Sequence, residues 1–190
     1  MKKLHRDKHG KSIIRDSLVG IISNADRIML RIAREQIDMY ERQVEECYAE
    51  MNKICEEQFA QELELLKTIP GVKGDSAVRI IAEIGTDMQA FASSASLVSW
   101  AGLRPRNDES AGRIKGRKTL HGNKYLRVLL VQCACGASRT VSSKFHKRYN
   151  SLNKRMNHNK ALLANARKLL VIIWNMLNYK QCYQPLNSGI

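Results

Sequence analysis

The sequence lacks the features that mark membrane proteins and small secreted ones. No apolar run in its 190 residues reaches the ~18 residues typical of a membrane span. The basic segment 1–12 is not followed by the apolar stretch of a signal peptide. Its five cysteines lie at spacings that match neither a zinc site nor a disulfide framework, so we expect reduced thiols and no metal bound by this chain. These absences favour a cytoplasmic protein.

Acidic residues are scarce in the C-terminal half. Residues 88–190 hold 18 Lys and Arg but only two acidic side chains, Asp108 and Glu109, whereas residues 1–65 hold 11 basic and 13 acidic ones. The net charge of +14 therefore comes from the C-terminal half, which alone carries +16. Such a concentration of positive charge predicts an anionic partner, and nucleic acid is the commonest one. The alternative is a basic ribosomal-type protein or one that is merely soluble.

Glycine and proline are absent between Ile21 and Ile69, as expected of one long helix. Within this stretch apolar residues recur in alternating steps of three and four. These seam residues are Leu30, Ala33, Ile37, Tyr40, Val44, Cys47, Met51 and Ile54. The repeat lasts about four heptads and predicts a coiled-coil helix or a helical hairpin. Because one helix cannot bury such a seam alone, we expect a partner helix, either from a second copy in a homo-oligomer or from another part of the protein.

The rest of the sequence indicates four shorter helices. They are expected over residues 75–84, 94–101, 124–138 and around 162–177. Asp75 or Ser76 can cap the first and Gly85 can end it. The last has a core-facing stripe, formed by Leu162, Leu163, Ala166, Leu169, Leu170, Ile173, Met176 and Leu177. A loop or short irregular hairpin is expected at 104–122 and a polar connection at 142–159. Since no β alternation and no internal repeat is present, the predicted fold class is all-α.

The segment Ile69–Gly74, with sequence IPGVKG, resembles the turn of a helix-hairpin-helix DNA-binding motif. Gly71 and Gly74 allow tight backbone angles and a close approach of the main chain to another molecule, and Val72 is expected to hold the turn in the core. The following helix begins with free N–H groups that suit a phosphate oxygen, and Lys73 adds a positive charge beside them. We therefore expect Gly71, Lys73 and Gly74 to contact DNA phosphates. The alternative is a plain αα-hairpin that binds nothing.

A basic, glycine-bearing segment surrounds Ser110. Its cations, which we expect to contact phosphate, are Arg104, Arg106, Arg113, Lys115, Arg117, Lys118, Lys124 and Arg127. A hydroxyl among cations and small residues suits nucleophilic attack on a phosphodiester, provided that a base or a bound metal takes its proton. Taken alone the pattern is weak, because a serine in such a loop is usually an ordinary turn residue. Trp100 and Trp174 fall on helical stripes and are expected in the core.

Five motifs occur in order between Leu65 and Leu130. They are the IPGVKG turn, AEIG at 82–85, Phe91-x5-Leu97-x3-AGL-x-PR, ESAG at 109–112 and GNKYLR at 122–127. Together they resemble the C-terminal transposase domain of the insertion sequence 110/116/902 family, which comprises serine-type, bridge-RNA-guided DNA recombinases. The resemblance implies that Ser110 is the nucleophile that becomes joined to DNA. It also implies that Arg104, Arg106, Lys124 and Arg127 contact DNA or its phosphates.

The resemblance also implies that the metal ligands and the serine nucleophile lie on different domains. Family members begin with a resolvase-like domain that supplies four acidic residues for Mg²⁺, and these 190 residues show no such domain. We therefore expect Mg²⁺ only with an acidic domain supplied from elsewhere, and no activity of this chain alone. The expected organisation is a tail and helix start at 1–25, a coiled-coil linker helix at 26–66, the helix-hairpin-helix-containing serine transposase domain at 67–180 and a tail at 181–190.

The expected partners are DNA and a guide RNA, in a cytoplasmic, nucleoid-associated setting. The main alternative is a nucleic-acid-binding, dimerising module without catalysis, and the last is a coiled-coil scaffold that binds no nucleic acid. A scaffold of this kind leaves the net charge of +16 on the C-terminal half unexplained.

Overall fold

The structure is a computed structural model that describes residues 20, 22–105, 108–110, 113–116, 119 and 121–184, with only the backbone for residues 108–110 and 113–116. The chain divides into two compact units, Met1–Tyr48 and Ala49–Ile190, which are described separately. The described residues are predominantly helical, as predicted, and two short strands form their only sheet. None of the described helices is both long and apolar enough to cross a lipid bilayer.

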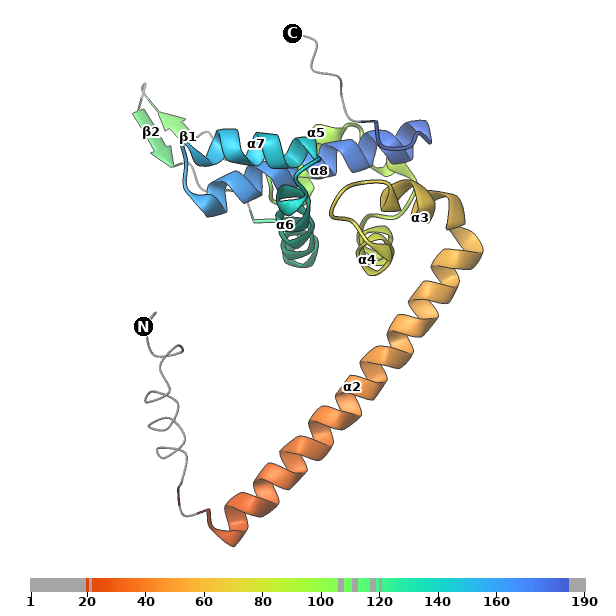
Figure 1. Cartoon of the computed structure of the whole chain (residues 1–190), viewed down its shortest axis with the longest axis vertical. Helices are drawn as coiled ribbons and strands as arrows, with labels where there is room; N and C mark the ends of the chain where they lie inside the picture. The colour runs from red at the N-terminus through yellow and green to blue at the C-terminus, as the bar shows by residue number, and fades with distance from the viewer. Residues whose placement is uncertain are drawn as a thin grey trace. The chain divides into compact units, whose positions relative to one another are not determined.

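One long helix, α2 (Asn24–Gln58), occupies most of the segment that lacks glycine and proline (Figure 1). It begins at a reciprocal cap, in which the amide of Asp26 donates to Ser23 Oγ (3.2 Å) and the amide of Ser23 donates to Asp26 Oδ2 (3.0 Å). Hydrogen bonds from Ser23 lower the pKa of Asp26. Further along, Arg31 and Glu35 form an ion pair at 2.9 Å across one turn.

The apolar seam of α2 is exposed over most of its length. Leu30, Ile37, Tyr40 and Val44 are each between 51% and 62% exposed. Met51, near the end of the seam, is partly buried against the hydrophobic core of the second unit. The seam is therefore an apolar surface without a cover in the described part of the chain.

The single helix expected over 26–66 is two helices. Phe59 leaves the helical region (φ −132°, ψ 29°) and packs against the core, and α3 (Ala60–Lys67) follows it. The break allows Leu63, Leu65 and Leu66 to be buried, each at 6% exposure or less. Burying a leucine stabilises by roughly 1.5–3 kcal/mol, more than the ~1 kcal/mol of a helical hydrogen bond that is lost at a break. Core packing therefore outweighs helix continuity here.

The second unit is built around its last helix, α8 (His158–Tyr179). Its packing partners are α3, the 3-10 turn η1 (Met88–Ala90), α5 (Ser94–Trp100), α6 (Lys124–Arg139) and α7 (Lys144–Asn153). Figure 1 shows α8 running along this body, with α7 beside one end and α3 at the other. The predicted stripe is confirmed, since every member except Leu163 is at most 6% exposed.

The three helices expected before α8 are present as α4 (Gly74–Ile84), α5 and α6. The expectation that Asp75 or Ser76 is the N-cap is wrong, because α4 begins at Gly74 with Lys73 as its N-cap. The predicted end is confirmed: Gly85 takes φ +69°, a left-handed angle that favours glycine.

The polar connection expected at 142–159 contains a helix, α7, that the sequence pattern did not reveal. Only Phe145 and Leu152 of this helix are buried, so its apolar periodicity is weak. A buried amide fixes it instead: Asn165 Nδ2 on α8 donates to the carbonyl oxygen of Phe145 (3.1 Å) and to Ser138 Oγ on α6 (3.0 Å). This polar junction joins three helices and sets where the basic side chains of α7 lie.

Candidate nucleic-acid interface

Ser110 lies at the end of the first strand of a β-hairpin. Strand β1 (Asp108–Ser110) pairs antiparallel with β2 (Arg113–Gly116), and Ser110 stands opposite Arg113 in the register. The expected short irregular hairpin is therefore present, and Figure 1 shows it at the edge of the helical body. The backbone sets Ser110 across from a basic position, while the side chains of both strands lie outside the described part of the chain.

The base of this hairpin is closed by contacts between its two ends. Pro105 and Thr119 form an antiparallel bridge, and the amide of Asn123 donates to the carbonyl oxygen of Trp100 at 3.3 Å. A Cβ atom on Gly122 would lie only 2.5 Å from that same carbonyl oxygen, so a side chain at this position would prevent the approach. The segment between α5 and α6 is thus anchored at both ends to one place on the body.

Asn123 fixes the start of α6 beside α4. Its Oδ1 accepts hydrogen bonds from the amides of Tyr125 and Leu126, both at 3.0 Å, as an N-cap residue does. Its Nδ2 donates to Glu83 Oε2 on α4 at 2.5 Å. No role was expected for Asn123, although an asparagine directly before an apolar helical run is a recognisable N-cap signal.

The predicted cations fall into three groups. Arg104 and Lys124 are exposed and Arg127 is partly buried. Arg113 and Lys115 lie on β2, of which only the backbone is described. The remaining ones, Arg106, Arg117 and Lys118, lie outside the described residues. Of the candidate set, the structure therefore brings Arg104 and Lys124 to the surface near the hairpin base, and phosphate contact by any of the eight stays a prediction.

Trp100 is exposed at the base of the hairpin, so the expectation that it lies in the core is wrong. It is 43% exposed and packs edge-on against Phe91, with 5.6 Å between ring centroids. The short helix α5 places Leu97 and Val98 in the core, and Trp100 follows on another face. Trp100 lines two shallow hollows, one shared with Arg104 and His121 and the other with Lys124 and Tyr125. Aromatic faces beside cations are typical of surfaces that contact nucleic-acid strands. Trp174, in contrast, is partly buried against the core.

The Pro-Gly turn between α3 and α4 packs against α6. Gly71 has φ +86°, and a Cβ atom there would lie 2.3 Å from the carbonyl oxygen of Cys133 and 2.5 Å from the amide nitrogen of Ala137. Val72 is buried, as expected. The close approach that requires glycine at position 71 is therefore to a helix of the same chain. Contact between Gly71 and DNA stays a prediction.

The start of α4, next to this turn, faces solvent. Lys73 is exposed and Gly74 is partly exposed. A hydrogen bond runs from the amide of Ala77 to the carbonyl oxygen of Lys73 (2.8 Å), and the amide of Gly74 lies in the first turn, where a helix has no carbonyl acceptor of its own. Asp75 is exposed in the same turn and adds one negative charge. The helix start thus offers amides and one cation, as a phosphate-binding turn does.

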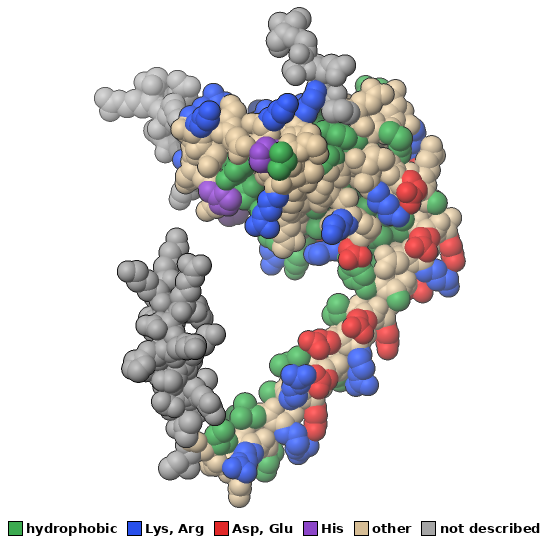
Figure 2. Space-filling model, viewed as in Figure 1, with side chains coloured by type: hydrophobic (Ala, Val, Ile, Leu, Met, Phe, Trp, Pro, Cys, Tyr) green, Lys and Arg blue, Asp and Glu red, His purple; other side chains and the backbone are tan. Residues whose placement is uncertain are grey.

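Charge of one sign dominates the helical body. Helices α5 to α8 contain nine Lys or Arg and no Asp or Glu. On the face drawn in Figure 2, acidic side chains lie along α2 and around α3 and α4, whereas the rest of the body shows Lys, Arg and His. A basic helical body with exposed aromatics and an open helix start is typical of a domain that contacts nucleic acid.

Comparison with known proteins identifies a family domain within the chain. Residues 63–150 match the family described as Transposase IS116/IS110/IS902 family. The chain is 33% identical over 130 residues to the insertion element IS900 uncharacterized 42 kDa protein of Mycobacterium paratuberculosis, over 66% of this chain and 32% of that protein. It is 30% identical over 154 residues to the transposase for insertion sequence element IS1111A of Coxiella burnetii (strain RSA 493 / Nine Mile phase I), over 79% of this chain and 40% of that protein.

Residues 63–150 form a transposase domain of the IS116/IS110/IS902 type, as the motifs between Leu65 and Leu130 led us to expect. It spans about a third of one relative and two fifths of the other. The matched segment contains the Pro-Gly turn, the hairpin with Ser110 and α6.

The Mg²⁺ ion that the family resemblance implies finds no place among the described residues. Nowhere in that part of the chain do three His, Cys, Asp or Glu side chains come close enough together to hold a metal ion.

Proposed function

We propose that this chain is the DNA-handling part of a transposase in which the Ser110 hydroxyl attacks a DNA phosphodiester. The observation that best supports the proposal is the hairpin, whose register sets Ser110 opposite Arg113 and whose base is closed by the Pro105–Thr119 bridge. A cation beside the nucleophile stabilises the negative charge that builds up on the phosphate oxygens during the attack.

The chemistry of this step is a transesterification. A bond forms between Ser110 Oγ and phosphorus, one P–O bond of the DNA backbone breaks, the serine proton passes to a base, and the released sugar oxygen takes up a proton. The number of phosphate ester bonds is unchanged, so the reverse step can rejoin a strand. The expected product is one DNA end joined covalently to the protein.

The test is a covalent adduct between protein and DNA. The chain is incubated with labelled insertion-sequence-end DNA, Mg²⁺ and the resolvase-like domain of a relative added in trans, and products are separated under denaturing conditions. We expect a protein-linked DNA band that disappears in Ser110→Ala. Ser142→Ala, which removes an exposed serine between α6 and α7, serves as the matched control and should keep the band. An adduct that persists in Ser110→Ala would contradict the assignment of the nucleophile.

We also propose that the turn before α4 contacts DNA phosphate in the manner of a helix-hairpin-helix motif, through Lys73 and the amides at Gly74 and Gly71. The exposed Lys73 and the partly exposed Gly74 at the helix start support this. Such contacts release counterions, so affinity should fall steeply with salt. Lys73→Gln should lower the slope of log affinity against log salt by about one, whereas Lys154→Gln, an exposed control outside this turn, should change it less. An affinity that does not vary with salt would rule out this binding mode.

The cations around the hairpin form the rest of the proposed DNA surface. They are Arg104, Arg106, Arg113, Lys115, Arg117, Lys118, Lys124 and Arg127. The exposed rings of Trp100 and Tyr125 lie among the described members of this set and can pack on sugars or bases, with Lys124 Nζ 5.1 Å from the Tyr125 ring centroid. A guide RNA would meet the same cations, so competition between unlabelled RNA and labelled DNA tests whether both partners use one surface.

We further propose that α2 pairs with α2 of a second copy as a coiled coil. The exposed seam at Ile37, Tyr40 and Val44 supports this, because paired helices bury such a seam. Binding to DNA together with self-association, but with no adduct under the conditions above, would favour the alternative function of a dimerising nucleic-acid-binding module without catalysis.

A further inference from the structure

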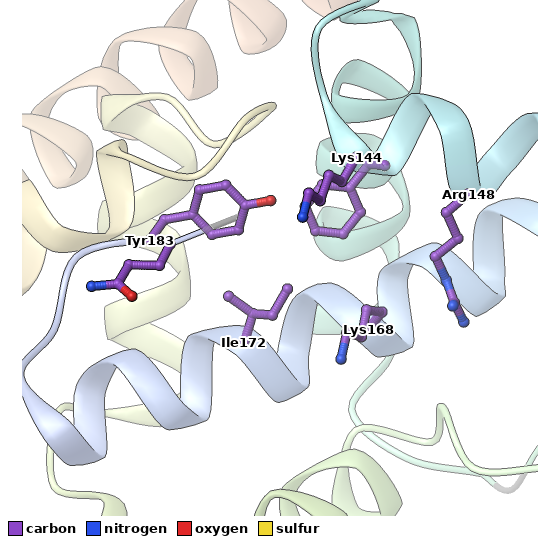
Figure 3. Close-up of a pocket in the computed structure, with 7 residues that line it drawn as sticks. Lys144, Arg148, Lys168, Ile172 and Tyr183 are labelled. Carbon is purple, nitrogen blue, oxygen red and sulfur yellow. The ribbon is translucent and has the colours of Figure 1, made fainter. Parts of the chain in front are cut away.

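A small pocket lies between α7, α8 and the segment that follows α8. Its apolar wall is formed by Phe145, Ile172 and Tyr183. Three cations surround this wall: Lys144 and Arg148 from α7 and Lys168 from α8. Figure 3 shows Tyr183 reaching from the C-terminal segment towards Lys144, with Ile172 below and Lys168 and Arg148 to one side.

The walls of this pocket are fixed by contacts to three other parts of the body. The carbonyl oxygen of Phe145 accepts the hydrogen bond from Asn165, which holds the start of α7 on α8. The amide of Tyr183 donates to Thr68 Oγ1 at 3.1 Å, which ties the C-terminal segment to the end of α3. The rings of Phe145 and Tyr183 stack nearly parallel, with 6.3 Å between centroids. The pocket is therefore preformed and needs no rearrangement of these walls to accept a ligand.

Size and charge restrict what the pocket can hold. Its volume of about 160 Å³ lies below the ~300–1,000 Å³ of sites that enclose a drug-sized molecule, so it admits a single ring system and leaves the rest of the ligand outside. Its lining contains no acidic residue, and neither α7 nor α8 contains one. A flat ring that enters against Tyr183 and carries negative charge outside meets both requirements.

We propose that this pocket receives an unpaired base of a nucleic-acid strand, while the phosphates on either side lie against Lys144, Arg148 and Lys168. The proposal rests on the proposed function, since it requires that the chain binds nucleic acid. Bases inside a duplex are stacked and paired, so only a single-stranded or flipped-out nucleotide can insert its ring. The pocket thus selects for unpaired strands, unlike the turn before α4, for which we propose contact with backbone phosphate alone.

The experiment measures the affinity of the full chain for three labelled probes of equal length: single-stranded DNA, single-stranded RNA and blunt duplex DNA. Tyr183→Leu removes the aromatic face and should weaken single-strand binding on the order of tenfold, with duplex binding unchanged. Lys168→Gln should weaken single-strand binding several-fold and reduce its salt slope by about one. Lys154→Gln, exposed and outside the pocket, is the matched control for charge and should have a smaller effect.

A direct probe of insertion is a fluorescent adenine analogue placed in the single strand. Its emission should be quenched on binding to the wild-type chain and recover in Tyr183→Leu, and thermal unfolding confirms that this variant is folded. If Lys168→Gln and a folded Tyr183→Leu both bind single strands like the wild type, the proposal is wrong. Duplex binding that persists and weakens in Lys73→Gln would then leave the proposed function intact. If none of the probes binds, the proposed function fails and this inference fails with it.

Discussion

Helices α8 and α2 carry the same kind of apolar stripe, which is buried in α8 and exposed in α2. In α8 the stripe lies at the centre of the helical body, with Leu169, Leu170 and Ile173 fully buried. In α2 the seam residues Ile37 and Val44 are 51% and 62% exposed. The pattern predicts which face of a helix is apolar, but what covers that face depends on the rest of the fold. We therefore expect substitutions in α8 to change folding and substitutions in α2 to change association.

The largest expected effect tests this contrast directly. Leu170→Ala should lower the free energy of unfolding by about 2–5 kcal/mol, because it leaves a cavity at a fully buried site. Val44→Ala on α2 is the control and should change the unfolding of the body by less than ~0.5 kcal/mol. Urea denaturation followed by circular dichroism measures both. Equal losses in the two variants would show that the exposed seam of α2 contributes to the fold of the body as α8 does.

The next prediction concerns the Pro-Gly turn between α3 and α4, which packs against α6. Gly71→Ala should lower the free energy of unfolding by roughly 2–5 kcal/mol. The left-handed angle contributes ~1–2 kcal/mol and the clash with α6 contributes ~1–3 kcal/mol. Gly85→Ala is a matched control, because Gly85 also has positive φ (+69°) but a Cβ atom there would meet nothing within 4 Å. It should cost only the ~1–2 kcal/mol of the angle. Similar losses in thermal unfolding would mean that the close approach of the turn to α6 contributes nothing.

Sequence alone predicted much of this fold, and the misses have physical causes. Apolar stripes and helix-ending residues in the sequence predicted α4, α5, α6 and α8, since each has a continuous apolar face or a glycine at its end. Helix α7 was missed because a buried polar contact from Asn165, and not an apolar stripe, holds it. The break at Phe59 was missed because its cause, the burial of α3 leucines, is a tertiary effect.

The candidate site was predictable only in part. Motifs indicated the transposase domain and the turn before α4, because these depend on local sequence, and the role of Ser110 stays a prediction. They did not indicate that Gly71 approaches α6 or that Trp100 faces solvent, since both depend on how distant segments pack. They also did not indicate the pocket of Lys168 and Tyr183, whose walls come from segments far apart in the chain.

A smaller loss is expected where polar contacts, not apolar ones, hold the body together. Asn165→Ala should lower the free energy of unfolding by about 1–3 kcal/mol, because it removes two hydrogen bonds from a fully buried amide. Asn175→Ala on the same helix is the control: its side chain is exposed and donates only to the carbonyl oxygen of Val171. Hydrogen exchange should show that α7 becomes less protected in the first variant only. Unchanged protection of α7 would contradict the role of Asn165.

The ion pair between α3 and the end of α8 should contribute least to the body. Lys180 Nζ lies 2.5 Å from Glu62 Oε1, and this hydrogen bond lowers the pKa of Glu62. A lowered pKa in the folded state stabilises the protein above the ordinary carboxyl pKa of ~4.3, and this contribution is lost as the pH falls through the lowered value. Because Lys180 is 45% exposed, Glu62→Gln should cost under about 1 kcal/mol at neutral pH and nothing in acid. A loss in unfolding free energy that grows on acidification would have the wrong sign.

The last prediction concerns α2, where the expected change in unfolding of the body is close to zero and the expected change in association is large. Sedimentation of the full chain should show a concentration-dependent dimer. Ile37→Ser should weaken this dimer, because the substitution places a hydroxyl in the seam that the dimer would bury. Cys47 is an exposed seam residue, and in a parallel pair it would face its own copy. Mild oxidation should then give a linked dimer that is lost in Cys47→Ser and kept in Cys182→Ser. A chain that stays monomeric at all concentrations would rule out a second copy as the cover of the seam. The difference from α8 would then be that another partner covers the seam of α2.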